Sequence, residues 1–429
     1  MKSISVNRHS HHPVPVRTAA IASGSCFALL ASLEIMQVGP EVALWATPAI
    51  LGAAILIAWA AESAQFYVAQ GFALAILAWL QTLPEFAVEA VLAWKQQVPL
   101  LLAGLTGALR LLTGLGWPMI YFTAAFFYRR KHGKAMQSIK LHDEHCVEVV
   151  GLLVPLLYMF VVWYKSSLSL IDAAVLILIY LTYLAVLSRM PPQDAEGIED
   201  LDRVPKAIVT ARPAIRNLAI IGLFAAGGAL IYFTAEPFLG SLLALSAMIG
   251  VPSFVFVQWV APFVSEFPEK VSAFYWARTI VRAPMALMNM VSSNINQWTL
   301  LAAMLPILFS ISRGEPSSIP FDSQQELELL MTIGQSLVAM IFLFNMEMLW
   351  WEAGALFSLW FIQFLASPVH PGEQWWRMAA SHTHEWVTWI YFLWFGFEAI
   401  KALLGHRPPA ALVLFGQMWR THIRPSRAA

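Results

Sequence analysis

The sequence has little charge: 12% of its 429 residues are Asp, Glu, Lys or Arg, while 59% are hydrophobic. Soluble domains carry about 25% charged residues, so this composition excludes an ordinary soluble globular protein. Acidic and basic residues balance to a formal net charge of zero, which gives no indication of a nucleic-acid partner. With a mean hydropathy of +0.65, we expect a polytopic membrane protein whose surroundings are a lipid bilayer.

Cysteine and long polar segments are also scarce. Cys26 and Cys146 are far apart in the sequence, which excludes a disulfide framework and leaves the compartment open. The longest polar stretch runs from Ser188 to Arg216 and holds a Pro-Pro pair and an acidic run. It indicates a linker between two halves, because no insert is long enough to form a soluble domain.

What the chain has in abundance is long apolar runs. The first run follows a basic N-terminal segment, as the apolar region of a signal sequence does. However, it is long, contains Glu34 and is followed by further spans, so we expect a first helix that is retained. Windows of membrane-spanning length predict an all-α fold of about twelve helices. They lie near residues 20–37, 42–64, 68–94, 97–127, 146–164, 168–188, 216–249, 252–278, 283–311, 326–347, 349–367 and 384–404.

The distribution of Lys and Arg predicts the orientation. Basic residues concentrate in 1–17, 129–140, 189–216, 278–282 and 406–427, and with twelve helices all five segments fall on one side. The positive-inside rule makes this side the cytoplasm. We therefore expect an integral protein of a bacterial inner membrane with both termini cytoplasmic. The opposite side keeps Lys95, Lys165, Arg313 and Arg377.

Two of the expected helices carry the same polar interruption. Residues 81–85 read QTLPE and residues 265–269 read SEFPE. Pro84 and Pro268 lack an N–H, so the carbonyls four residues earlier lose their helix partner, and a carboxylate in hydrocarbon is expensive. The orientation places the two helices in opposite directions, which predicts an inverted repeat with a duplicated cation site at the bilayer midplane.

The residue types around these breaks suit a hard cation. Glu85 and Glu269 each lie beside an exposed carbonyl, and Glu89 and Glu266 share their helix faces. Four converging carboxylates would not all ionise without bound cations or protons. Further oxygen ligands are available from Gln81, Thr82 and Ser265.

An alternative reading assigns the prolines to helix kinking and pairs the glutamates with buried basic residues such as Arg110. The segments downstream of the breaks favour the cation site. The second half places Asn289, Ser293, Asn294 and Gln297 on an otherwise apolar helix about 20 residues on. The first half keeps small residues in the equivalent stretch, 103–110, but not the amides.

This pattern resembles the sodium/calcium exchanger family. Its two inverted repeats carry Gly-Thr-Ser-Leu-Pro-Glu, followed by Gly-Asn-x-x-Gly-Ser-Asn. Residues 265–269 match the first motif, and Asn289 and the Ser293-Asn294 pair match the second. In the first repeat the Leu-Pro-Glu matches fully, whereas Gly104, Ala108 and Leu109 replace Asn, Ser and Asn.

The resemblance implies a domain order and a function. It divides the chain into an N-terminal tail and extra helix (1–41), repeat 1 (42–188), a cytoplasmic linker (189–215), repeat 2 (216–367) and an extra C-terminal helix and tail (368–429). It implies a secondary antiporter, not an enzyme, without a cofactor. Glu85 and Glu269 would bind Ca²⁺, exchanged for Na⁺ or H⁺. Missing amides in repeat 1 put Na⁺ sites in doubt, and Glu89 and Glu266 favour proton coupling.

Other functions remain open as alternatives. They are a monovalent cation/proton exchanger and a non-transporting membrane scaffold with a degenerate site. Three histidine clusters, 9–12, 142–145 and 382–385, contain metal-ligand residue types. The last two together would suggest a membrane di-metal enzyme, but the orientation places them on opposite faces, which argues against a shared site. We expect the first two clusters to be solvated polar segments.

Overall fold

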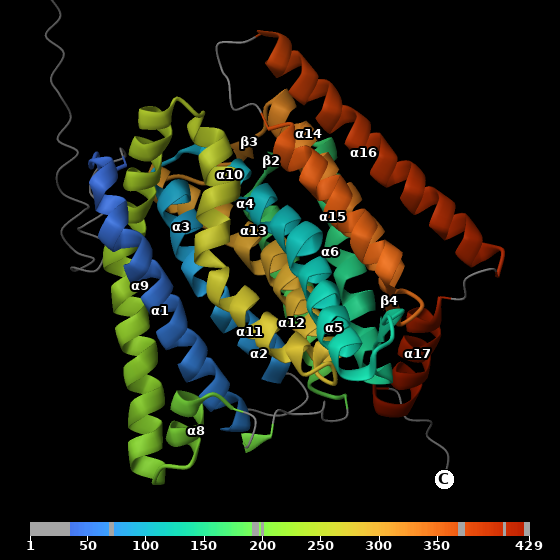
Figure 1. Ribbon diagram of the computed structural model, residues 1–429. Coiled ribbons are helices and arrows are strands. Elements are labelled where there is room, and N and C mark those ends of the chain that lie inside the picture. Colours follow the sequence, from blue (N-terminus) through green and yellow to red (C-terminus); the bar gives the residue numbers. More distant parts are fainter. Residues whose placement is uncertain are drawn as a thin grey trace, which may run out of the picture.

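A computed structural model describes residues 35–67, 73–190, 197–198, 201–367, 374–405 and 409–423. Within these residues the fold is helical, as predicted, apart from four short strands (Figure 1). Seven of the described helical stretches are long and apolar enough to cross a membrane by themselves. The fold class of a polytopic all-α membrane protein is thereby confirmed.

The two halves of the chain contain corresponding helices in the same order. The first half has α1 (Ala43–Ala64), α2 (Ala73–Gln81), α3 (Leu83–Trp94), α4 (Val98–Leu111), α5 (Trp117–His132), α6 (Cys146–Tyr164) and α7 (Leu170–Leu187). The second has α9 (Pro213–Ile249), α10 (Ser253–Ser265), α11 (Phe267–Arg278), α12 (Ala283–Asn296), α13 (Ala302–Arg313), α14 (Ser323–Leu343) and α15 (Trp350–Leu365).

Several predicted boundaries differ from the structure. Residues 20–34 of the first predicted helix lie outside the described residues, and 35–39 are not helical. The expected linker contains α8 (Arg203–Val209), and the last long helix, α16 (Gln374–Leu403), begins ten residues earlier than expected. A further helix, α17 (Ala410–Met418), was not expected. These segments are short or polar, so hydropathy windows of membrane-spanning length miss them.

The two halves run in opposite directions. In Figure 1, α2 and α3 lead from the lower end of the molecule to the upper end, while α10 and α11 lead back. Each broken helix packs against the other half: α2 and α3 against α12 and α13, and α10 and α11 against α4 and α5. The interior of the molecule is therefore shared by both repeats.

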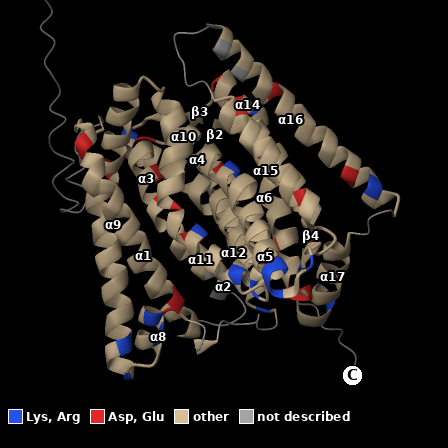
Figure 2. Ribbon diagram, viewed as in Figure 1, with Lys and Arg blue, Asp and Glu red and all other residues tan. Residues whose placement is uncertain are grey.

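Two strand pairs repeat this inverted relationship. β1 (Ser138–Lys140) pairs antiparallel with β4 (Glu347–Leu349), and β2 (Ser167–Leu168) pairs antiparallel with β3 (Ile319–Pro320). Each pair joins a connection from one half to a connection from the other. The pairs lie at opposite ends of the molecule, and Lys and Arg concentrate at the β1–β4 end (Figure 2).

Candidate functional site

Both Pro-Glu motifs break their helices at a single residue. α2 ends at Gln81 and α3 begins at Leu83, leaving Thr82 with φ −86° and ψ −2°. α10 ends at Ser265 and α11 begins at Phe267, leaving Glu266 with φ −94° and ψ 2°. These angles lie in the sparsely populated bridge region. Each predicted apolar span is thus two half-helices that meet end to end.

The paired glutamates occupy equivalent places after the two breaks. Glu85 and Glu269 each lie in the first turn of the second half-helix, directly after the proline. The backbone N–H groups of a first turn favour a carboxylate. Their exposed fractions are 2% and 0%, so both carboxylates lie in the interior. The hydroxyl of Ser293 donates to Glu269 Oε1 at 2.5 Å.

Gln297 links the two halves at the centre of the site. Its Nε2 donates to Glu85 Oε2 at 2.6 Å and to Glu266 Oε1 at 2.7 Å. It begins a π-helical turn, Gln297–Leu301, and the corresponding helix of the first half has a π-helical turn at Leu112–Gly116. Such turns recur at functional sites. The sequence identified Gln297 as a buried amide but did not assign it to the site.

The other predicted ligands divide into two groups. Asn289 Nδ2 donates to Gln81 Oε1 at 3.1 Å, which connects the amide helix α12 to the first break. The hydroxyls of Thr82 and Ser265, by contrast, donate back to carbonyls of their own helices, at 2.8 Å and 3.4 Å. Asn294 Nδ2 donates to the carbonyl of Met290 at 3.3 Å within α12.

Glu89 occupies space that a glycine leaves. A Cβ atom built on Gly104 would lie 1.8 Å from Glu89 Oε1, so no larger residue fits at 104 while this carboxylate stays in place. Glu89 is 2% exposed and lies one turn after Glu85 on α3. The absence of a side chain at position 104 and the position of the Glu89 carboxylate are therefore sterically linked.

Glu266 forms an ion pair within the site. Lys270 Nζ lies 2.5 Å from Glu266 Oε2, and the two side chains are 5% and 0% exposed. Lys270 was not among the predicted site residues, although its position four residues after Glu266 places both on one helix face. Arg110, considered as a partner for the glutamates, instead lies 2.6 Å from Glu328.

Several buried oxygens of this region accept no hydrogen bond from any described residue. The Glu85 carboxylate is close enough to Glu89, Glu266 and Glu269 to interact electrostatically. Buried carboxylate and amide oxygens without a hydrogen-bond donor suit a hard cation, which takes six to eight oxygen ligands when it is Ca²⁺. They are Glu85 Oε1, Glu89 Oε2, Glu269 Oε2, Asn289 Oδ1, Asn294 Oδ1 and Gln297 Oε1.

A cavity of about 430 Å³ reaches the second break from one end of the molecule. It lies between α1 and α11, and Phe267 and Pro268 form part of its wall. Glu62, Asp202 and Arg282 also line it, so its charged lining is of mixed sign.

A separate polar network surrounds Arg110. Glu328 accepts from Gln258 at 3.0 Å and lies 2.8 Å from His384 Nδ1. His384 belongs to α16 and is 4% exposed, so the extra C-terminal helix is tied to the core by a buried polar contact. Glu328 and His384 also line a second cavity, of about 690 Å³.

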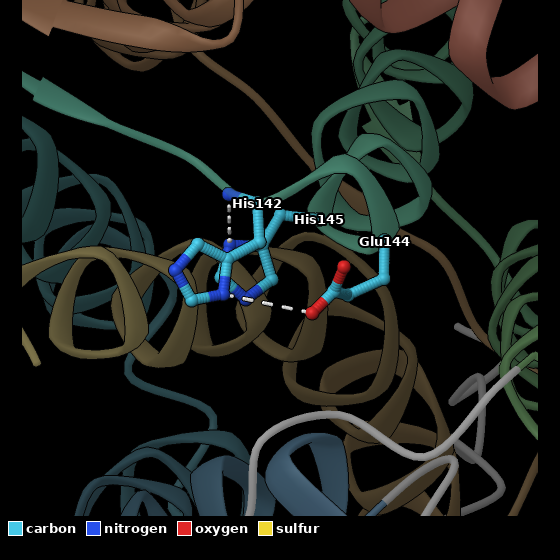
Figure 3. Close-up of side chains that lie close together, drawn as sticks. All are labelled: His142, Glu144 and His145. Carbon is cyan, nitrogen blue, oxygen red and sulfur yellow. Dashed lines mark hydrogen bonds and ion pairs between the residues drawn. The ribbon is translucent and has the colours of Figure 1, made fainter.

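The cluster of His142, Glu144 and His145 caps a helix (Figure 3). The His142 N–H donates to His145 Nδ1 at 3.3 Å, and the His142 side chain accepts from the backbone of His145. His142 and Asp143 are exposed, as expected for a solvated segment, whereas His145 is buried. Leu141 bonds to Met346 beyond the C-terminal end of α14, whereas His384 contacts Glu328 near its start, so the clusters do not share a site. Residues 9–12 lie outside the described residues.

Comparisons with known proteins point to one family. A family model described as "Sodium/calcium exchanger protein" matches residues 42–189 and 219–367. The crystal structure of the H⁺/Ca²⁺ exchanger CAX is similar with a TM-score of 0.79 and 31% identity, covering 90% of this chain and 92% of that one. No curated protein matches the chain.

More distant solved structures share the fold alone. The sodium-calcium exchanger NCX_Mj gives a TM-score of 0.51 at 17% identity, covering 76% of this chain and 97% of that one. Native YfkE gives a TM-score of 0.56 at 16% identity, covering 74% and 88%.

Proposed function

The chain belongs to the sodium/calcium exchanger family of membrane cation transporters, and from that premise we propose that it exchanges Ca²⁺ for H⁺ at Glu85 and Glu269. Membership in this family makes the chain a transporter and not an enzyme, with transported cations and no cofactor. The observation that carries the proposed site is the set of buried carboxylate and amide oxygens without a hydrogen-bond donor around the two half-helix junctions.

Two observations support Ca²⁺ and H⁺ as the exchanged ions. The 31% identical structure, which covers 90% of this chain, is named an H⁺/Ca²⁺ exchanger. The first repeat also lacks the amides that the family's second motif provides, with Gly104, Ala108 and Leu109 in their place. Fewer neutral oxygen ligands and more carboxylates favour a divalent cation in competition with protons.

The decisive measurement is ⁴⁵Ca²⁺ flux in proteoliposomes under an imposed pH gradient or an imposed Na⁺ gradient. We expect uptake driven by the pH gradient and its loss in both Glu85→Gln and Glu269→Gln. The exposed Glu315 pairs with Arg313 outside the site, so Glu315→Gln is the matched control and should transport as the wild type does. Unchanged uptake in both site variants would end the proposal.

The same assay separates the alternatives. Uptake driven only by the Na⁺ gradient would identify Na⁺, and not H⁺, as the counter-ion. Transport of monovalent cations without Ca²⁺ would favour a monovalent cation/proton exchanger. No flux together with no cation-dependent thermal shift would indicate a scaffold with a degenerate site.

We also propose that the β1–β4 end faces the cytoplasm of a bacterial inner membrane. The concentration of Lys and Arg at that end supports this orientation (Figure 2). In a background without Cys26, an impermeant thiol reagent applied from outside should label a cysteine at Arg313 and not one at Lys134. The opposite labelling would invert the orientation.

A further inference from the structure

Lys270 and Glu266 form a buried ion pair inside the candidate cation site. The ammonium lies 2.5 Å from Glu266 Oε2, with both side chains almost fully buried. Glu266 is the residue at which α10 breaks into α11, and Lys270 lies one turn later on α11. The pair is therefore built into the same half-helix junction that presents Glu269.

The contacts give the site glutamates different roles. Both oxygens of Glu266 are engaged, one by Lys270 and the other by Gln297 at 2.7 Å. Glu85 and Glu269, in contrast, each keep one oxygen that accepts nothing from a described residue. Glu266 is thus committed to an internal partner, while Glu85 and Glu269 have an oxygen to offer to cargo.

The charge balance shows what the ammonium does. Among the described residues, Lys270 is the one basic side chain that pairs with a site carboxylate, Glu266. Arg110 pairs with Glu328 instead. A buried carboxylate without a partner is strongly unfavourable. Without Lys270, a proton or a second cation from solution would have to compensate Glu266.

We propose that the Lys270 ammonium is a tethered monovalent cation, which fills a subsite at Glu266 that would otherwise bind a free ion such as Na⁺. This inference rests on the proposed function and deepens it. A tethered group is present at a high effective concentration whatever the bulk salt. Ca²⁺ binding at Glu85 and Glu269 then requires no monovalent co-ion.

The test is ⁴⁵Ca²⁺ uptake by the full chain in proteoliposomes under a pH gradient, with equal Na⁺ or equal choline on both sides. Wild-type uptake should be the same in both salts. Lys270→Met should lose at least ~10-fold in choline, since it leaves a buried carboxylate unpaired, and should recover in Na⁺. Lys270→Arg keeps a cation and should stay independent of Na⁺.

Two further variants make the result decisive. The double variant Lys270→Met/Glu266→Gln removes both charges and should regain uptake in choline. Lys401 pairs with Glu398 on α16, outside the site, so Lys401→Met is the matched control and should not acquire Na⁺ dependence.

Each outcome has a defined meaning. If Lys270→Met takes up Ca²⁺ in choline as fast as the wild type does, the proposal of a tethered cation is overturned. It is also overturned if Lys270→Met loses uptake in both salts and the double variant does not recover it. If Lys270→Met fails to fold, the double variant decides: activity in choline supports the inference and inactivity overturns it. Absence of Ca²⁺ uptake by the wild type would instead contradict the proposed function.

Discussion

The Arg110 guanidinium lies 2.6 Å from the Glu328 carboxylate, and their side chains are 0% and 4% exposed. Arg110 belongs to α4 of the first half and Glu328 to α14 of the second. The Arg110 guanidinium also lies 4.9 Å from the Trp259 ring and donates to Gln363 at 3.3 Å. The pair thus joins both repeats through a buried contact.

We expect Arg110→Leu to destabilise the protein by about 3–5 kcal/mol, because it leaves the buried Glu328 carboxylate without its strongest partner. Thermal unfolding of the detergent-solubilised protein measures this effect. The matched control is Arg313→Leu, which breaks a pair whose side chains are 44% and 64% exposed and should change stability by less than about 1 kcal/mol. Equal effects of the two variants would contradict the assigned role.

Gly104→Asn, which restores the family's residue, should reduce Ca²⁺ uptake and not improve it. The new Cβ would lie 1.8 Å from Glu89 Oε1, so the carboxylate at the far end of this flexible side chain must leave its position in the site. Gly52→Ala, where a Cβ meets nothing within 4 Å, is the control; normal uptake by Gly104→Asn would count against this steric link.

Gln297→Leu keeps the side chain's approximate volume and removes both donated hydrogen bonds. Each hydrogen bond to a charged acceptor contributes about 1.5–3 kcal/mol. The loss of both bonds should therefore change the KM for Ca²⁺ by at least tenfold. Gln96→Leu removes an amide that bonds to Ser312 outside the site and should leave the KM unchanged. The same KM in both variants would show that Gln297 does not organise the site.

A single methyl group should separate two central helices. A Cβ on Gly107 would lie 1.9 Å from the backbone carbonyl oxygen of Gln258, so Gly107→Ala must push α4 from α10 and lower the melting temperature. Gly222 on α9 has nothing within 4 Å of its Cβ position, and Gly222→Ala should raise stability by about 0.5–1 kcal/mol. Shifts of the same sign would refute the close helix approach.

Sequence reasoning recovered the features that depend on local pattern. Hydropathy predicted α6 and α7 almost to the residue, and the prolines at 84 and 268 marked the helix breaks. Ion pairs between residues far apart in the sequence could not be predicted in this way. Glu328 is 218 residues from Arg110, and neither residue type specifies a partner at that separation. The Lys270–Glu266 pair, in contrast, follows a four-residue helical spacing, which the sequence alone displays.

The strand pairs have a consequence for biosynthesis. Residues 138–140 hydrogen-bond with 347–349, and 167–168 bond with 319–320. The first half therefore leaves the ribosome with two strand edges and one broken helix whose partners have yet to be translated. Its helices can insert one by one, but the connections that hold them in register close only when most of the second half has followed.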